Sequence, residues 1–225
     1  MVVAFGIVLP TKLWEYCLAA FLIILAPGPS VLFTIARAIA WGRKTAILTV
    51  LGNVLGAFTL SCFVAIGLGP IISRSTLVYI AIQLSGGVYL GYLGINAIRH
   101  SSIKAKDIAS EKSNQSQLPP SIKKSIWDGY WVGALNPKGA VFFASILPSF
   151  VDRGKGNVTS QLLSMGAIFS LMAFISDGSW GLLAGTLRDW LSHEITRLQR
   201  LRIIGGGVMI GLGVFTIISG LRHIS

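Results

Sequence analysis

The chain has 225 residues, of which 53% are hydrophobic and only 12% are charged, about half the charged share of a typical soluble domain. So few charges cannot cover a soluble protein, and the composition also excludes a disordered chain, collagen, a coiled coil and a disulfide scaffold. The formal net charge of +11 is expected of a membrane protein with basic loops on one side of the lipid bilayer, and no basic stripe on a soluble module indicates nucleic acid as a partner.

Six apolar stretches are each long enough to cross a bilayer, which takes about 20 helical residues. They lie near Leu13–Ala36, Thr45–Ile72, Leu77–Ile98, Asp128–Val151, Gln161–Leu187 and Ile203–Leu221. No basic segment precedes the first stretch and no small-residue cleavage site ends it, so we expect a retained helix rather than a signal peptide. The predicted fold is all-α, a polytopic membrane protein of six transmembrane helices.

The first stretch contains Pro27-Gly28-Pro29-Ser30. A proline removes a backbone N–H and clashes with the preceding turn, so two prolines around a glycine are expected to open the helix. Inside a bilayer the freed backbone groups need a partner from the protein, from water or from a ligand. Tyr16, near the start of the stretch, is expected in an interfacial aromatic belt.

The second helix carries Asn53, about nine residues from the end that we expect to face the cytoplasm. Its amide either binds a substrate or an opened backbone, or joins two helices. Glycines spaced four residues apart predict close packing within one bundle and leave a homo-oligomer possible. These pairs are Gly52/Gly56, Gly87/Gly91, Gly181/Gly185 and Gly207/Gly211.

A polar segment rich in Ser, Lys and Gln follows the third helix and contains Pro119-Pro120. This composition predicts a mobile linker over residues 99–124. It separates a three-helix unit at 1–98 from a second three-helix unit at 125–225. Two units with an odd number of helices must have opposite orientations, as in the inverted repeats of many transporters.

The fourth helix carries Asn136-Pro137-Lys138 at the place that corresponds to the break in the first helix. Corresponding breaks in two inverted halves are the best sequence pointer to a transporter's site at the middle of the membrane. Lys138 lies about ten residues into its helix, where a cation costs at least about 2.5–3.5 kcal/mol and therefore must face a partner or water.

Asp177 in the fifth helix is the only acidic residue well inside a predicted span, at a depth similar to that of Lys138. Two roles remain open for it. Either Asp177 and Lys138 form a structural ion pair, or Asp177 takes up and releases a proton during transport.

The distribution of Lys and Arg predicts the orientation of the helices. Thirteen lie on one predicted side: Arg37, Arg43, Lys44, Arg99, Lys104, Lys106, Lys112, Lys123, Lys124, Arg188, Arg197, Arg200 and Arg202. Five lie on the other: Lys12, Arg74, Arg153, Lys155 and Arg222. The first side should be cytoplasmic, which places both termini outside.

No arrangement of residues indicates an enzyme. The three histidines lie near predicted interfaces or the terminus, and no HExxH, Walker or dinucleotide-binding motif occurs. Cys17 and Cys62 lie in apolar runs without CxxC spacing, which is typical of buried structural thiols rather than a metal site. We expect no cofactor and no metal.

The sequence resembles the lysine exporter (LysE/RhtB) family of amino-acid exporters over nearly its whole length. The resemblance rests on Ala26-Pro27-Gly28-Pro29-Ser30 with Trp41-Gly42-Arg43-Lys44, on the segment 133–140 with its Asn-Pro-Lys-Gly, on Leu147-Pro148-Ser149-Phe150, and on Asp177 with Trp180. It departs from the family at Ser30, where Asn is usual. The resemblance implies a six-helix protein of the bacterial inner membrane that exports amino acids or their derivatives, driven by the proton gradient.

The expected site therefore combines two sets of residues. Substrate binding is assigned to Pro27, Gly28, Pro29, Ser30, Asn53, Asn136, Pro137 and Lys138, and proton coupling to Asp177 and Lys138. Amides freed by the first break, together with Lys138, would face the substrate carboxylate, because helix N-termini bind anions. Asp177 would hold the amino group or a proton, while one three-helix unit rocks against the other.

Two other functions are less consistent with the sequence. A membrane thiol–disulfide electron carrier needs a reactive cysteine in each half, whereas Cys17 and Cys62 both lie in the first. A non-transporting membrane scaffold has no need of the buried charges Lys138 and Asp177.

Overall fold

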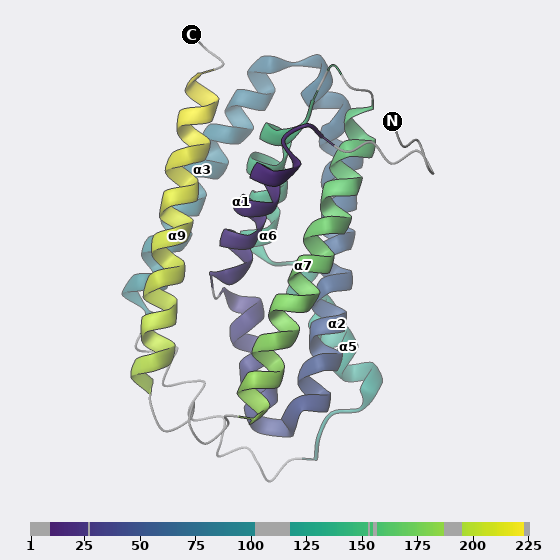
Figure 1. The fold of residues 1–225 in the computed structure, drawn as a ribbon, viewed down its shortest axis with the longest axis vertical. Coiled ribbons are helices and arrows are strands. Elements are labelled where there is room, and N and C mark those ends of the chain that lie inside the picture. Colours follow the sequence, from purple (N-terminus) through teal and green to yellow (C-terminus); the bar gives the residue numbers. More distant parts are fainter. Residues whose placement is uncertain are drawn as a thin grey trace.

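The computed structural model describes residues 10–26, 28–101, 118–152, 154, 157–186 and 195–222 (Figure 1). All regular structure in these ranges is helical, which confirms the predicted all-α class. The α-helices are α1 (Leu13–Leu25), α2 (Pro29–Arg74), α3 (Thr76–Arg99), α5 (Ile122–Ala134), α6 (Pro137–Val141), α7 (Val158–Thr186) and α9 (Ile195–Leu221).

The first predicted helix is in fact two helices. It begins at Leu13 as expected, but α1 ends at Leu25 and α2 begins at Pro29, so Pro-Gly-Pro separates them. The segment after the break continues beyond Ala36 to a second interruption at Gly42, whose φ of 83° and ψ of −178° are not helical. Such a φ favours glycine, and Gly42 lets the chain turn back into the long second half of α2 (Figure 1).

The fourth predicted helix, Asp128–Val151, is also broken. It begins earlier, at Ile122, and α5 ends at Ala134, two residues before α6. After the single turn of α6 the chain forms a π-helix over Phe142–Ile146 and a 3₁₀-helix over Leu147–Phe150. Pro137 stands at the start of α6, where its missing N–H is not needed.

The remaining predicted helices are continuous. α3 extends the predicted Leu77–Ile98 by one residue at each end, and α9 begins at Ile195 rather than Ile203. α7 begins at Val158 rather than Gln161 and is described to Thr186, so the predicted end at Leu187 lies outside the described residues. Most of the predicted linker also lies outside them.

Four described helical segments are long and apolar enough to cross a membrane: Pro29–Gly67, Thr76–Arg99, Val158–Ala184 and Arg202–Leu221. α1 is apolar but shorter. α1 and α5, the helices that precede the two breaks, have 13 residues each and are too short to cross a membrane alone.

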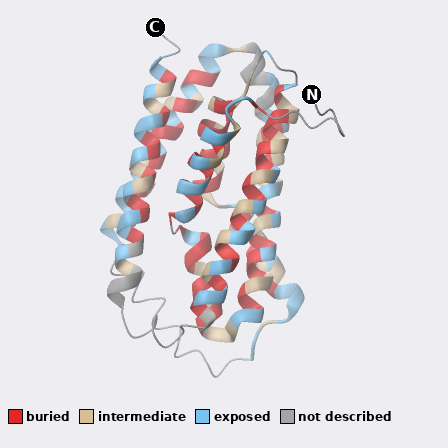
Figure 2. Cartoon of the chain, in the orientation of Figure 1, coloured by how far each residue is buried: buried red, intermediate tan, exposed pale blue. Residues whose placement is uncertain are grey.

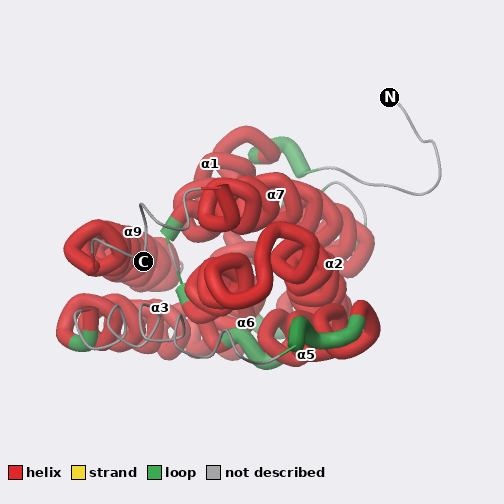
Figure 3. The backbone as a smooth tube through the Cα atoms, turned by 90° about the horizontal axis from the view of Figure 1, so that it is seen from below, coloured by secondary structure: helices red, strands yellow, loops and turns green. Residues whose placement is uncertain are grey.

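α3 packs against α9 at one edge of the bundle, while α2 packs against both α5 and α7 (Figure 3). Glycines allow the close approach of α3 to α9 and of α2 to α5. In the α3–α9 pair, a Cβ on Gly87 would meet the carbonyl oxygen of Gly213, and one on Gly94 would meet that of Gly206; the reverse contacts hold as well. The two helices are therefore antiparallel at this contact.

Between α2 and α5 the glycines again face backbone on both sides. A Cβ on Gly52 or Gly56 would collide with carbonyls of α5, and one on Gly129 or Gly133 would collide with carbonyls of α2. Of the three predicted glycine pairs whose surroundings the structure describes for both members, Gly52/Gly56 alone has both at a helix contact. Gly91, Gly207 and Gly211 have open space where a side chain would be.

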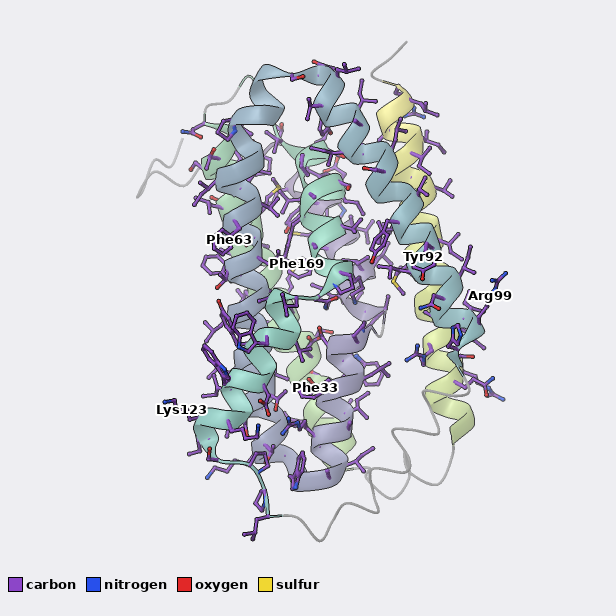
Figure 4. The ribbon with its side chains drawn as sticks, turned by 180° about the vertical axis from the view of Figure 1, so that it is seen from behind. Phe33, Phe63, Tyr92, Arg99, Lys123 and Phe169 are labelled. Carbon is purple, nitrogen blue, oxygen red and sulfur yellow. The ribbon has the colours of Figure 1, made fainter. Side chains whose placement is uncertain are left out.

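Burial divides the side chains into an apolar interior and an apolar exterior (Figure 2). Phe63 and Tyr92 point outward and are 73% and 59% exposed, whereas Phe169 points inward and is 7% exposed (Figure 4). Large exposed apolar side chains over so much of the surface suit contact with lipid rather than water.

Tyr16 does not lie in an interfacial belt, contrary to the prediction. Its side chain is fully buried against Phe142 and Phe150, and its hydroxyl donates a hydrogen bond to the carbonyl oxygen of Met165 at 2.6 Å. A buried tyrosine hydroxyl needs such a partner, and here it fastens α1 to α7.

Candidate functional site

A small cavity lies between the two helix breaks. Its volume is about 40 Å³, room for about two or three water molecules. Most of its lining is apolar side chains and glycines, and the polar lining residues are Ser30, Asn53, Asn136, Lys138 and Asp177. All five were assigned to the site from the sequence, and the structure brings them together.

Lys138 spans the distance from the second break to the first. Its Nζ donates hydrogen bonds to the carbonyl oxygens of Ile23 at 2.9 Å and Ala26 at 2.8 Å, at the C-terminal end of α1. In an unbroken helix the Ile23 carbonyl would accept from the N–H of residue 27, but proline has none. The ammonium therefore supplies the donor that Pro27 lacks.

Gly28 makes room for this contact. A Cβ at position 28 would lie 3.1 Å from both Cε and Nζ of Lys138. Gly28 is buried and Pro29 is exposed, while Pro27 lies outside the described residues.

Asn136 links the two breaks from the other direction. Its Oδ1 accepts from the backbone N–H of Lys138 at 3.0 Å and so caps α6, while its Nδ2 donates to Ser30 Oγ at 2.6 Å. Ser30 lies in the first turn of α2. The side chain of Asn136 thus caps the start of α6 and also binds the start of α2.

Asn53 and Asp177 form the opposite wall. Asn53 Nδ2 donates to Asp177 Oδ2 at 3.1 Å, which joins α2 to α7. Asn53 Oδ1 is buried, has no hydrogen-bond partner in the described part of the chain, and faces Gly133 of α5, another cavity residue. An unpaired buried oxygen costs free energy, so this atom is an open acceptor.

Lys138 and Asp177 do not touch. Both are nearly fully buried, 7% and 5% exposed, and among the described residues that line the cavity they are the only charged ones. Within the described chain, the ion pairs shorter than 4.0 Å do not include this pair. A direct ion pair, one of the two roles left open by the sequence, is therefore absent from this conformation, and the charges attract each other across the cavity.

The sequence analysis did not anticipate the backbone acceptors at Ile23 and Ala26. A signal for one of them was present, because a proline at position 27 necessarily leaves the carbonyl at position 23 without its helical donor. Nothing in the sequence indicated that the donor would come from Lys138, which is 115 residues away from Ile23.

A second polar contact joins α2 and α5 nearer the end of the bundle where the chain turns at Gly42. Arg37 pairs with Asp128 at 2.7 Å, and its guanidinium also lies over the rings of Phe33 and Trp41. Lys124 reaches Asp128 at 3.4 Å. Arg37, counted from the sequence among the loop charges, thus holds the two interrupted helices together at this end.

An apolar helical bundle whose two broken helices end on a buried polar cavity is the arrangement of a membrane transporter. The chain belongs to the LysE type translocators, whose family model matches residues 21–220.

Curated relatives are membrane proteins of bacteria. The chain is 25% identical to the uncharacterized membrane protein YrhP of Bacillus subtilis over 91% of this chain and 98% of that protein. It is 26% identical to an uncharacterized membrane protein of Pseudomonas aeruginosa, over 72% of this chain and 74% of that one. An uncharacterized membrane protein of Vibrio cholerae is 25% identical, over 88% and 93% respectively. No solved structure matches the chain significantly.

Proposed function

We propose that the protein is a secondary active exporter of amino acids or close derivatives, driven by the proton-motive force, in the bacterial inner membrane. The observation that carries this proposal is the pairing of an open donor with an open acceptor on one cavity. An ammonium has three N–H donors, and only two from Lys138 have partners among the described residues. Across the cavity, Asn53 Oδ1 accepts from none.

These two groups complement an amino acid. The carboxylate would bind the third N–H of Lys138, close to Ser30 and the start of α2, where a helix N-terminus favours negative charge. The amino group would bind Asn53 Oδ1 and the carboxylate of Asp177. A zwitterion would thus place each of its charges against the opposite charge of the site.

The cavity has to widen for this to happen, because about 40 Å³ is too small for an amino acid. The structure therefore corresponds to a closed conformation of the site. Movement of the half-helices would enlarge the cavity, and the short pieces on either side of each break are the parts that can move with the least loss of packing.

The proposed architecture has six crossings in two inverted units, at 1–98 and 125–225, joined by the linker at 99–124. α1 with the start of α2 would form one crossing, and α5 with α6 and the following turns another. The antiparallel glycine contacts of α3 with α9 support this, because the third helices of two inverted units run in opposite directions.

Proton coupling is assigned to Asp177 together with Lys138. Among the described residues, Asp177 accepts one hydrogen bond, from a neutral amide, and contacts no cation, so the charge that balances it is Lys138 across the cavity. A carboxylate in this position can be neutralised by a proton without breaking an ion pair.

Transport by the purified protein tests the proposal. The protein is reconstituted into liposomes that contain radiolabelled amino acids, singly and in groups, and a pH gradient is imposed across the membrane. Release or uptake against a concentration gradient, abolished by a protonophore, is the expected result. If no amino acid or derivative moves while the protein is folded and inserted, the proposed substrate class is wrong.

Orientation is tested with two matched exposed positions in a variant lacking Cys17 and Cys62. A cysteine at Asn157 should react with an impermeant thiol reagent in intact cells, and one at Lys123 should react only after the membrane is opened. The opposite labelling would reverse the proposed topology, with both termini inside.

A further inference from the structure

The C-terminal end of α1 has the chemistry of a binding site for a small cation. The carbonyl oxygens of Ile23 and Ala26 converge on one point, at the negative end of the helix dipole. α1 carries no basic residue in its last turn that could neutralise this end locally. In transporters with discontinuous helices, such carbonyls coordinate the coupling cation.

The point where the carbonyls converge is occupied by the Nζ of Lys138, at 2.9 and 2.8 Å. The other groups around it come from every neighbouring element of the cavity. α2 contributes Ser30 and Asn53, the turn before α6 contributes Asn136, and α7 contributes Asp177, the other charge among the described lining residues. The ammonium thus sits between two carbonyl dipoles and a carboxylate across the cavity, as a free monovalent cation would.

We propose that the C-terminal end of α1 is a monovalent-cation site which the chain fills with its own Lys138 ammonium. Two consequences follow. The transporter needs no Na⁺ from the medium, because the site is already occupied by a tethered cation. Removal of the ammonium opens the site to a small cation from solution, drawn in by the two carbonyls and by Asp177.

This site also links substrate to helix position, a step that rests on the proposed function. A substrate carboxylate bound to the third N–H of Lys138 would draw the ammonium away from the Ile23 and Ala26 carbonyls. When the ammonium turns toward the substrate, the end of α1 loses its donors, and the half-helix is released from the second break.

Thermal unfolding of Lys138→Ala in detergent tests the site without any assumption about transport. The variant removes three methylenes and the ammonium, which leaves a space that propylammonium fits. With about 100 mM propylammonium, ammonium or Na⁺, Tm of the variant should rise by about 2–4 °C, and that of the wild-type protein should not. Choline, which is too bulky, is the control ligand, and Lys123→Ala, an exposed lysine on α5, is the control variant.

The same Tm values overturn the proposal if no small cation stabilises Lys138→Ala more than it stabilises the wild-type protein and Lys123→Ala. Should Lys138→Ala not fold, Lys138→Gln takes its place in the assay, because its side chain is only one atom shorter than that of lysine and still ends in an N–H donor group. Propylammonium then becomes too large, and ammonium and Na⁺ are the probes.

Transport by the wild-type protein gives a second, independent test. Export in liposomes should be unchanged when choline replaces all Na⁺ on both sides, and a requirement for Na⁺ would contradict a site filled by Lys138. Failure of the wild-type protein to export any amino acid would refute the proposed function alone, because the Tm assay of the cation site does not depend on it.

Discussion

The two helix breaks solve the same chemical problem in different ways. At the second break, the side chain of Asn136 caps α6. The backbone N–H groups of Leu135 and Asn136, which follow α5, donate to carbonyl oxygens of α5 that lie three or four residues earlier in the chain. At the first break, the carbonyls of Ile23 and Ala26 are satisfied by a side chain 115 and 112 residues away.

The difference indicates which break is adjustable. A break that is satisfied by its own neighbours keeps its hydrogen bonds wherever the segment moves. A break that is satisfied from another helix changes partners when the two helices separate. The first break is therefore the part of the site whose geometry depends on the conformation of the whole bundle, and its variants should have the larger effects.

The largest effect is expected from Gly28→Leu. Its side chain would occupy the position of the Lys138 ammonium, since even a Cβ would lie 3.1 Å from Nζ. Export should fall at least about 100-fold, the loss typical of displaced groups in a functional site, while protein remains in the membrane. Liposome transport normalised to protein amount measures it. Gly67→Leu, at an exposed glycine of α2 with open space around it, should transport normally. Normal export by Gly28→Leu would show that the first break is only a kink.

The next effect concerns the charge that faces the first break. Asp177→Asn should abolish uphill export but retain exchange of substrate down its gradient, if Asp177 carries the proton. If Asp177 mainly neutralises Lys138, the single change leaves an uncompensated ammonium, which costs about 3–5 kcal/mol and lowers the amount of folded protein.

The double variant Asp177→Asn with Lys138→Gln distinguishes these roles. It removes both charges, so it should restore protein levels only where neutralisation is the main role. Membrane protein amount and transport are measured together for the two variants. Uphill export at the wild-type rate by Asp177→Asn would exclude Asp177 from coupling.

A smaller effect is expected from Asn136→Ala. The variant loses the cap of α6 and the hydrogen bond to Ser30, which should cost about 1–2 kcal/mol of stability. Ser121→Ala removes the corresponding cap of α5, an exposed one, and should lower Tm less. Thermal unfolding in detergent compares them. An equal loss from both variants would indicate that Asn136 contributes only a cap.

The smallest and sharpest contrast is between Gly28→Ala and Gly139→Ala. Both glycines are buried at a break, but a Cβ at Gly139 would find its nearest neighbours at an ordinary 3.8 Å. Gly28→Ala should slow export by up to about tenfold, which corresponds to about 1.4 kcal/mol. Gly139→Ala should be neutral or slightly stabilising, because alanine favours the helix. The measurement is the initial transport rate of each variant. Equal rates for Gly28→Ala and Gly139→Ala would contradict the proposed difference between the two breaks.

The sequence was sufficient to locate both breaks and the five polar residues that line the cavity. Proline acts locally, so Pro27, Pro29 and Pro137 indicate an interruption whatever the rest of the fold does. Counting residues from the helix ends also gave matching depths for Lys138 and Asp177, because the rise per residue of a helix is fixed.

Depth along a helix does not determine the direction of a side chain, so the sequence did not predict which groups Lys138 would contact. Lys138 turns toward α1 and away from direct contact with Asp177, a choice made by the packing of helices that are far apart in sequence. The burial of Tyr16 has the same origin, since an aromatic residue near a helix end can face either lipid or a neighbour. The π-helix at Phe142–Ile146 likewise follows from tertiary packing and has no marker in its apolar sequence.

The glycines of α3 and α9 differ sharply in what surrounds them, and this has a consequence for sequence variation among related proteins. Gly87, Gly94, Gly206 and Gly213 lie seven residues apart on facing helices, each against the backbone of its counterpart, whereas Gly91, Gly207 and Gly211 on the same two helices face open space. Among related sequences the first four positions should therefore retain glycine, while the other three should drift to alanine, leucine or valine. A spacing of four residues, the usual guide to such contacts, would select the wrong positions here, and the seven-residue spacing identifies the right ones.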